Sequence, residues 1–246
     1  FNNQKAPFDN VDVRRAFALG TDKATLANQV LGGNVVPADR ILPTGLVGTQ
    51  LAIQPLAFDA AAAKDALSKA GFADGQGLPP ITLAYAQEGD NELVAQALQG
   101  LWQQSLGVQV TLQSYELATF SKNLDTTYYT PTEGLQFYLS IWGADYPDPQ
   151  NFLSQQLQTD SPNNNGHYSN AEFDKLVAEA DQLGGQNDIE RRLQLYNQAE
   201  QIAINEVGWL PLYYPKFQIL LNPRVQGLSV TPTGLVAADW TKVSLK

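Results

Sequence analysis

The chain of 246 residues contains no cysteine and only one histidine, His167. The lack of cysteine excludes disulfides, thiolate metal sites, iron–sulfur clusters and cysteine nucleophiles. A single histidine also excludes a His-rich zinc site, so no metal or other cofactor is expected. Basic residues are scarce as well. Fifteen Lys and Arg against 25 Asp and Glu leave a net charge of −10, which argues against nucleic acid as a partner.

Methionine is also absent, and the first residue is Phe1. We therefore expect a processed form or a fragment of a longer protein, with any signal peptide outside the chain. No apolar run approaches the ~18 residues that a membrane-crossing helix needs. What the chain does contain is 43% hydrophobic and only 16% charged residues, enough to bury a core in one large or two small domains.

Helices are predicted where apolar residues recur at helical spacing between capping residues and glycines. They cover residues 9–31, 59–70, 93–106, 115–124, 169–183 and a longer stretch from 188. Asp59 is expected to cap the second helix, and Ser169 with Glu172 forms a capping-box pattern for the fifth. Leu93 is expected on the inward face of the third helix, and Ile189 on that of the last.

Strands are predicted where apolar residues alternate or gather in short runs. They cover residues 81–85, 108–112 and 135–142, with two short strands in 209–221, and the first reads as half-buried. A long ordered loop is expected over 37–55, a turn over 73–80 and a polar loop over 159–168. The alternation of helices and strands predicts a mixed α/β fold.

Few residues suit catalysis. His167 lies in a polar loop without a second histidine or a cysteine, so it is interpreted as a solvated loop residue. The glycines at 32–33 lack the spacing and the lysine of a phosphate loop, and no GxSxG elbow is present. Asp145 and Asp148 could serve as the carboxylate pair of a glycosidase, although the neighbouring prolines make a turn the default.

The segment IWGADYPDPQNFL, residues 141–153, is the most distinctive in the chain. Trp142 ends an aromatic strand, and Asp145 follows before a turn stiffened by prolines. A buried acid at this point would need a cation, yet no Lys or Arg lies between Lys122 and Lys175. The cation would come from elsewhere in the fold or from a ligand. Alternatively, Asp145 caps a short helix that begins near Asp148.

Four stretches of the chain resemble the extracellular solute-binding proteins of family 5, the dipeptide- and oligopeptide-binding components of ABC importers. They are PFDNVDVRRAFALGTDK (7–23), ALSKAGFADG (66–75), WGADYPDPQNFL (142–153) and NAEFDKLVAEADQLGGQNDIERRLQLY (170–196), the last followed by Pro211-Leu212. These stretches span nearly the whole chain in the order that the family has.

The resemblance implies one lobe of a two-lobed protein that closes around its ligand like a hinge. The expected fold is a type II, periplasmic-binding-protein-like α/β lobe, with a mixed sheet flanked by helices. Residues 1–221 would form the C-terminal ligand-binding lobe. Residues 222–246 would return to the other lobe, which this chain lacks.

The resemblance also implies roles for single residues. Asp145 occupies the position that holds the α-ammonium of a peptide, and Trp142 would form a wall of the pocket. Tyr128, Tyr129 and Tyr138 are candidates for further walls. Arg14 and Arg15 fall in the first matching stretch, where at least one is interpreted as helix surface.

The function implied is capture of a peptide for an ABC permease, without chemistry, by a monomer. The protein would work in the periplasm or at the extracellular face of the membrane, as a lipoprotein in its full-length form. One alternative is a family member that binds another solute, such as a sugar, an opine-like compound or, less compatible with one histidine, a nickel chelate. The others are a ligand-sensing lobe of a regulator and a hydrolase that uses Asp145 and Asp148.

Overall fold

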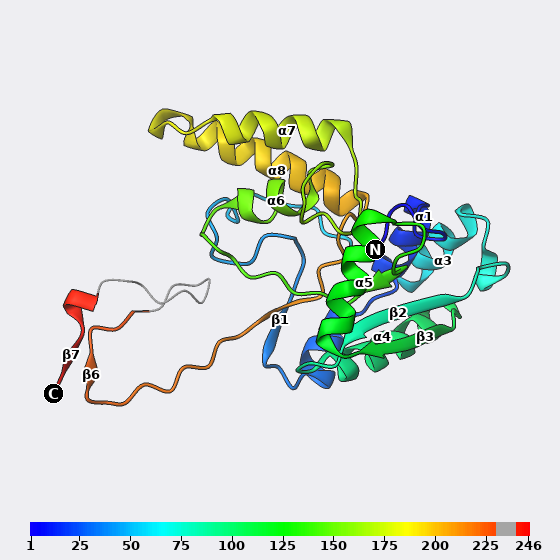
Figure 1. Cartoon of the computed structure of the whole chain (residues 1–246), viewed down its shortest axis with the longest axis horizontal. Coiled ribbons are helices and arrows are strands. Elements are labelled where there is room, and N and C mark those ends of the chain that lie inside the picture. The colour runs from blue at the N-terminus through cyan, green and yellow to red at the C-terminus, as the bar shows by residue number, and fades with distance from the viewer. Residues whose placement is uncertain (230–239) are drawn as a thin grey trace.

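The structure is a computed structural model that describes residues 1–229 and 240–246. Figure 1 shows a sheet with its helices at the right, a pair of longer helices at the top, and a C-terminal arm that leaves the body at the left. Two large hydrophobic cores, one around the sheet and one around the helical pair, hold the body together, and a smaller cluster lies on the second face of the sheet. This arrangement confirms the predicted mixed α/β fold.

The central sheet consists of three parallel strands in the order β3-β2-β4. They are β2 (Ile81–Ala86), β3 (Val110–Tyr115) and β4 (Phe137–Tyr138). The prediction of a half-buried first strand was wrong, because β2 is buried on both faces. Helix α4 (Asn91–Leu106) covers one face, and Phe120 of α5 (Leu117–Tyr129) packs on the other. Parallel sheets are normally covered in this way on both sides.

The helices of the first core are α1 (Val11–Leu19), α3 (Ala60–Lys69) and α4. Asp59 caps α3 as predicted, by accepting the backbone N–H groups of Ala61 and Ala62. The helix predicted over 9–31 is instead broken into α1, α2 (Lys23–Thr25) and a π-helical turn, η1 (Leu26–Val30). The break comes at Asp22, whose side chain caps α2.

Two predicted inward residues are exposed. Leu93 is 45% exposed, because the buried face of α4 is centred on Val94, Leu98 and Trp102, and Leu93 lies on the opposite side of the helix. Ile189 is 49% exposed because it begins its helix at the outer tip of the helical pair in Figure 1. The helices predicted around Leu93 and Ile189 are otherwise confirmed.

The second core joins α6 (Ser154–Leu157), α7 (Ala171–Gln182) and α8 (Ile189–Asn205). Short 3-10 turns also form over Ala73–Gly75 (η2) and Gln186–Asp188 (η4). The predicted capping box at α7 was wrong by one residue. Asn170 is the cap, and its side chain accepts from the backbone N–H groups of Glu172 and Phe173. The Ser169 hydroxyl instead accepts a hydrogen bond from the Thr159 hydroxyl.

A buried carboxylate fixes the long loop over residues 37–55. Glu200 on α8 is fully buried, and its Oε1 accepts the N–H groups of Ile41 and Leu42 at 2.9 Å each. It also pairs with the guanidinium of Arg40. The predicted ordered loop is therefore held against α8 by its residues 40–42.

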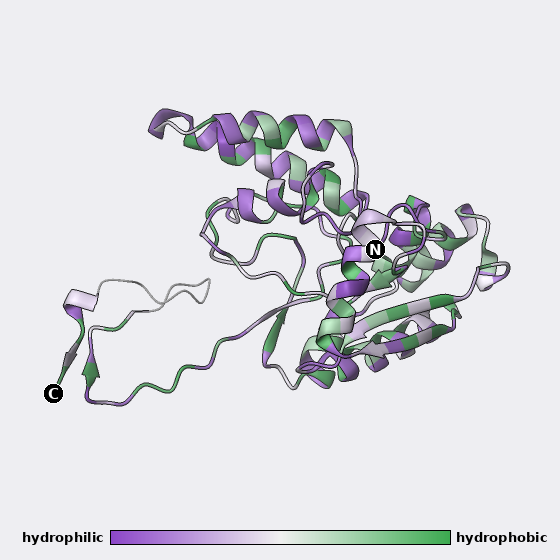
Figure 2. Cartoon of the chain, in the orientation of Figure 1, coloured by the Kyte–Doolittle hydropathy of each residue, from purple (hydrophilic) through white to green (hydrophobic). Residues whose placement is uncertain are grey.

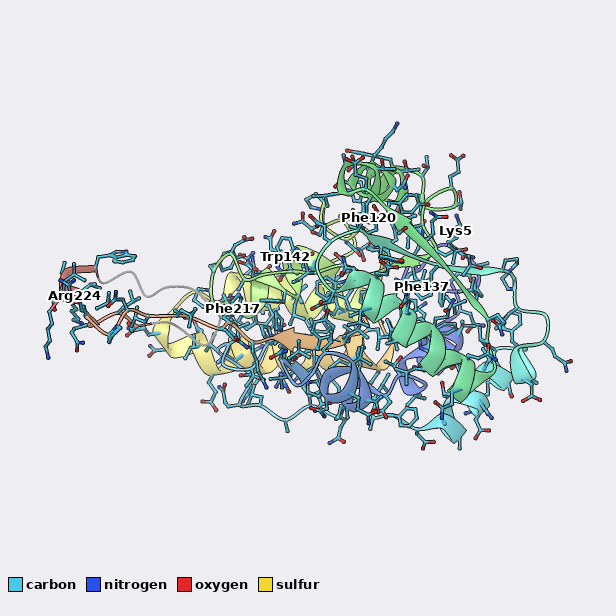
Figure 3. All side chains as sticks on the ribbon, turned by 90° about the horizontal axis from the view of Figure 1, so that it is seen from below. Lys5, Phe120, Phe137, Trp142, Phe217 and Arg224 are labelled. Atoms are coloured by element: carbon cyan, nitrogen blue, oxygen red, sulfur yellow. The ribbon has the colours of Figure 1, made fainter. Side chains whose placement is uncertain are left out.

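The arm begins after a small antiparallel pair, β1 (Val35–Pro37) with β5 (Tyr213–Pro215). Only β5 forms where two short strands were predicted. Beyond it the large apolar residues are exposed: Phe217, Ile219, Leu220 and Leu221. Figure 2 shows this apolar character along the arm, and Figure 3 labels Phe217 near its root and Arg224 toward its end.

At the far end of the arm, β6 (Val225–Gln226) pairs antiparallel with β7 (Ser244–Leu245), which follows a 3-10 turn, η5 (Trp240–Lys242). The prediction that residues 222–246 return to another lobe stays a prediction, and 230–239 lie outside the described residues. Within the described part, no helix is long and apolar enough to cross a membrane.

Candidate functional site

The segment singled out in the sequence crosses from one core to the other. The strand predicted over 135–142 pairs only at Phe137 and Tyr138, because β4 lies at the sheet edge and separates from β2 after Leu139 donates to the Ala84 carbonyl at 2.9 Å. Phe137 belongs to the first core, and Trp142 packs against the second. Figure 3 labels both residues. Asp145 therefore follows the crossing between the two cores.

Of the two acids in this segment, Asp148 is fully engaged by the fold. Its side chain accepts the N–H of Gln150 and caps a 3-10 turn, η3 (Pro149–Asn151). Arg192 of α8 also binds it with both terminal nitrogens, at 2.7 and 2.8 Å. This bond raises the pKa of Arg192. The cap of this turn is therefore Asp148, and the alternative that gave this role to Asp145 was wrong.

Asp145 has a different environment. Its side chain is exposed and forms no ion pair within the described chain. Its backbone N–H donates to Asn151 Oδ1, and its Oδ2 accepts from Asn151 Nδ2, both at 3.2 Å. Asp145 is thus an oriented carboxylate whose charge the described residues leave unpaired, which is a suitable arrangement for a ligand cation.

Asn151 joins Asp145 to Trp142. The Trp142 indole N–H donates to the same Asn151 Oδ1, at 3.0 Å. Asn151 is only 1% exposed, whereas Trp142 is half-buried. Sequence reasoning missed Asn151. The only signal was its position in the distinctive segment, because nothing in the local pattern separates this amide from an ordinary turn residue.

The three candidate tyrosines lie on other elements. Tyr138 ends β4 and packs edge-on against Phe120, and burial raises the pKa of its hydroxyl. Tyr128 and Tyr129 end α5, where Tyr128 stacks on His167 at 5.8 Å between ring centroids and Tyr129 is 77% exposed. Across the described residues, these rings form no ring contact with Trp142.

His167, Asp145 and Asp148 were the residues considered for catalysis or metal binding. No group of three His, Asp or Glu side chains in the described ranges could hold a metal ion. His167 places Nε2 2.9 Å from the Thr127 carbonyl oxygen, a structural bond between the polar loop and α5. Both carboxylate oxygens of Asp148 are bound by Arg192, so this side chain is already occupied and is poorly placed to act on a substrate as half of a glycosidase pair.

Comparison with known families matches residues 1–164 to the bacterial extracellular solute-binding proteins, family 5 (middle region). The chain belongs to this family. It is 35% identical over 234 residues to the probable deoxycholate-binding periplasmic protein YgiS of Escherichia coli K12, which covers 92% of this chain and 41% of that protein. It is 34% identical over 234 residues to the periplasmic oligopeptide-binding protein OppA of Salmonella typhimurium, with 92% and 40% covered.

Solved structures agree with this family assignment. HbpA2 from Haemophilus parasuis superposes with a TM-score of 0.81 at 27% identity, over 100% of this chain and 47% of that one. The murein tripeptide binding protein MppA of Escherichia coli gives 0.78 at 27%, over 96% and 44%. The fold is therefore a type II, periplasmic-binding-protein-like lobe, as expected. The chain spans less than half the length of these relatives.

Proposed function

We propose that this chain is the C-terminal lobe of a solute-binding protein that captures a peptide for an ABC importer and performs no chemistry. The observation that carries the proposal is Asp145, an oriented and exposed carboxylate without a cation among the described residues. The relative from Salmonella typhimurium, named as oligopeptide-binding, supports a peptide as the ligand.

The α-ammonium of a peptide fits Asp145 because it is a compact cation with three donors. When the two lobes close, this cation loses water, and only a fixed anion offsets the cost. Trp142 would form a wall beside the ammonium and exclude water from the pair. Tyr138, Tyr128 and Tyr129 would form walls farther along the ligand, since they lie on β4 and at the end of α5.

The arm supports the assignment of two lobes. Its exposed apolar side chains, including Phe217 and Leu220, have no cover in the described chain, and Leu220 is 103% exposed. An apolar surface of this kind is normally covered by protein. Residues 1–221 would form the lobe, with the exposed end of this range leading across to the other lobe, and residues 222–246 would pack on that lobe.

The whole protein would work as a monomer in the periplasm or at the outer face of the membrane, where it delivers its ligand to a permease. A lipid anchor on the full-length form belongs to the same proposal. Several relatives are named as periplasmic binding proteins, which supports the location.

A second candidate is a non-peptide solute, because the relative YgiS is named for deoxycholate and another relative, from Haemophilus influenzae, for heme. The unpaired charge of Asp145 restricts this choice. An anionic ligand placed against it would be repelled, whereas a cationic or neutral solute would be accepted. The peptide proposal is therefore favoured over a bile-acid-like ligand.

The test is mass spectrometry of the ligands released from the two-lobed protein after purification without added substrate. We expect peptides with free N-termini, recovered unchanged. Calorimetry with one peptide in its free and N-acetylated forms then tests the anchor, and the acetylated form should bind far more weakly. Recovery of a carboxylic acid without an amine would refute the peptide proposal, and recovery of a hydrolysed product would refute the absence of chemistry.

A further inference from the structure

We propose that Asn151 is the positioning residue of this site, and that its buried amide holds the Asp145 carboxylate and the Trp142 indole as one rigid unit. Asn151 itself is 1% exposed, so a ligand in the cleft would not contact it. The part of this inference that concerns ligand affinity rests on the proposed function. The part that concerns geometry does not.

The hydrogen bonds give the amide a single orientation. Asn151 Oδ1 accepts from the Trp142 indole at 3.0 Å and from the Asp145 backbone at 3.2 Å. Its Nδ2 donates to Asp145 Oδ2 at 3.2 Å. A flipped amide would place its own N–H groups against two donors and its oxygen against a carboxylate. All three contacts would then be lost together.

The amide is in turn held by the body of the protein. Asn151 closes the turn η3, which Asp148 caps, and Asp148 is bound through two nitrogens by Arg192 on α8. The orientation of the exposed Asp145 is therefore set by α8, through Arg192, the turn and Asn151.

An amide suits this task because it is neutral. A lysine or arginine in the same place would orient Asp145 as well, but it would also neutralise the charge that a cationic ligand needs. Asn151 orients one carboxylate oxygen and adds no charge. Binding then needs less ordering of the anchor, which lowers the entropic cost of association.

The geometry is tested in the 246-residue chain through the Trp142 indole N–H, by NMR and hydrogen exchange. Asn151→Ala should shift this resonance and remove its protection. Asn151→Asp keeps an acceptor for the indole, so the protection should remain. It also sets a second carboxylate against Asp145, so the pair should titrate with a raised pKa, measured by carboxyl NMR. An unchanged indole signal in Asn151→Ala would overturn the inference, as would an unperturbed titration in Asn151→Asp.

Asn164→Ala is the matched control. Asn164 is also a buried asparagine in the second half of the chain, 2% exposed, and its amide bonds to backbone atoms of Leu157, Gln158 and Tyr168. This variant should lose stability but leave the Trp142 indole signal in place. If it alters that signal as much as Asn151→Ala does, the change reports general loosening, and the inference fails.

The effect on the ligand is tested in the two-lobed protein by calorimetry with free and N-acetylated peptide. Asn151→Ala should weaken the free peptide about tenfold, the size of one charge-assisted hydrogen bond, and the acetylated peptide much less. On an Asp145→Asn background this selective loss should vanish, since Asn151 acts through Asp145. An equal loss for both peptides, or a loss that persists on that background, would refute the positioning role. If the parent binds both peptides equally, the ammonium anchor itself is refuted, while the NMR experiment still decides the geometry.

Discussion

Asp145→Asn is the substitution that most directly tests the proposed anchor. It removes one negative charge and nearly preserves the shape of the side chain. The remaining Oδ1 can still accept from Asn151 Nδ2, and the backbone N–H of residue 145 can still donate to Asn151 Oδ1. The free energy of unfolding should therefore change by no more than about 0.5 kcal/mol, as for most exposed positions.

The ligand should respond far more strongly. Under the proposed function, the α-ammonium of the peptide would lie out of bulk water in the closed protein, and the substitution would leave it without its counter-charge. Removing one partner of a buried ion pair costs about 3–5 kcal/mol, so the dissociation constant should rise by roughly 200-fold or more. An N-acetylated peptide carries no ammonium and should lose much less.

Calorimetry on the two-lobed protein measures both peptides, and Asp65→Asn is the control. Asp65 is an exposed acid on α3, so its substitution makes the same change in net charge on another element. It should leave both affinities within twofold of the parent, about 0.4 kcal/mol. The anchor is refuted if Asp145→Asn weakens both peptides equally, or if Asp65→Asn weakens the free peptide as much.

Three further substitutions test other parts of the chain. Trp142→Phe should remove most of the ligand-induced change in fluorescence of the two-lobed protein, and a fully retained change would place the reporter elsewhere. Glu200→Gln breaks the buried pair with Arg40 and should lower the free energy of unfolding, measured in urea, by about 3–5 kcal/mol. Glu179→Gln breaks a solvent-accessible pair with Arg191 and should cost at most about 1 kcal/mol. Burial lowers the pKa of Lys23 from 10.5 to about 8, so the unfolded chain binds the extra proton between these values and stability gains with rising pH there. In Lys23→Met, the free energy of unfolding should no longer rise between about pH 8 and 10.5 as it does in the parent. If the two proteins showed the same dependence of stability on pH, the lowered pKa of Lys23 would be contradicted.

Much of the fold could be predicted from local pattern. Asp59 as a cap, the end of α4 at Leu106, and the position of the strand β2 all follow from preferences of single residues or short windows. Two errors were misread local caps, at Asp22 and at Asn170, whereas the error at β2 came from a contact that a short window does not contain. The two-sided burial of β2 depends on α5, and its extent could not be read from the alternation alone.

The candidate site divides in the same way. Asp145 and Trp142 could be found because they stand in one distinctive segment. The asymmetry between Asp145 and Asp148 could not, since it depends on Arg192, which is 44 residues beyond Asp148. The tyrosines were candidates for further walls only, and that role stays a prediction; the structure places Tyr128 against His167.

The three polar residues of this segment show why the site needs the helix behind it. Asp148 is bound by Arg192 and fixes the turn, and Asn151 transmits that fixed geometry without charge. Asp145 is then the acid whose charge remains available. If Arg192 bound Asp145 instead, the turn would lose its ion pair, and the proposed ligand would lose its counter-ion. Both acids lie within six residues of Asn151, but only Asp148 is paired with Arg192 of α8. The position of Arg192 on α8 therefore determines which of the two carboxylates stays unpaired.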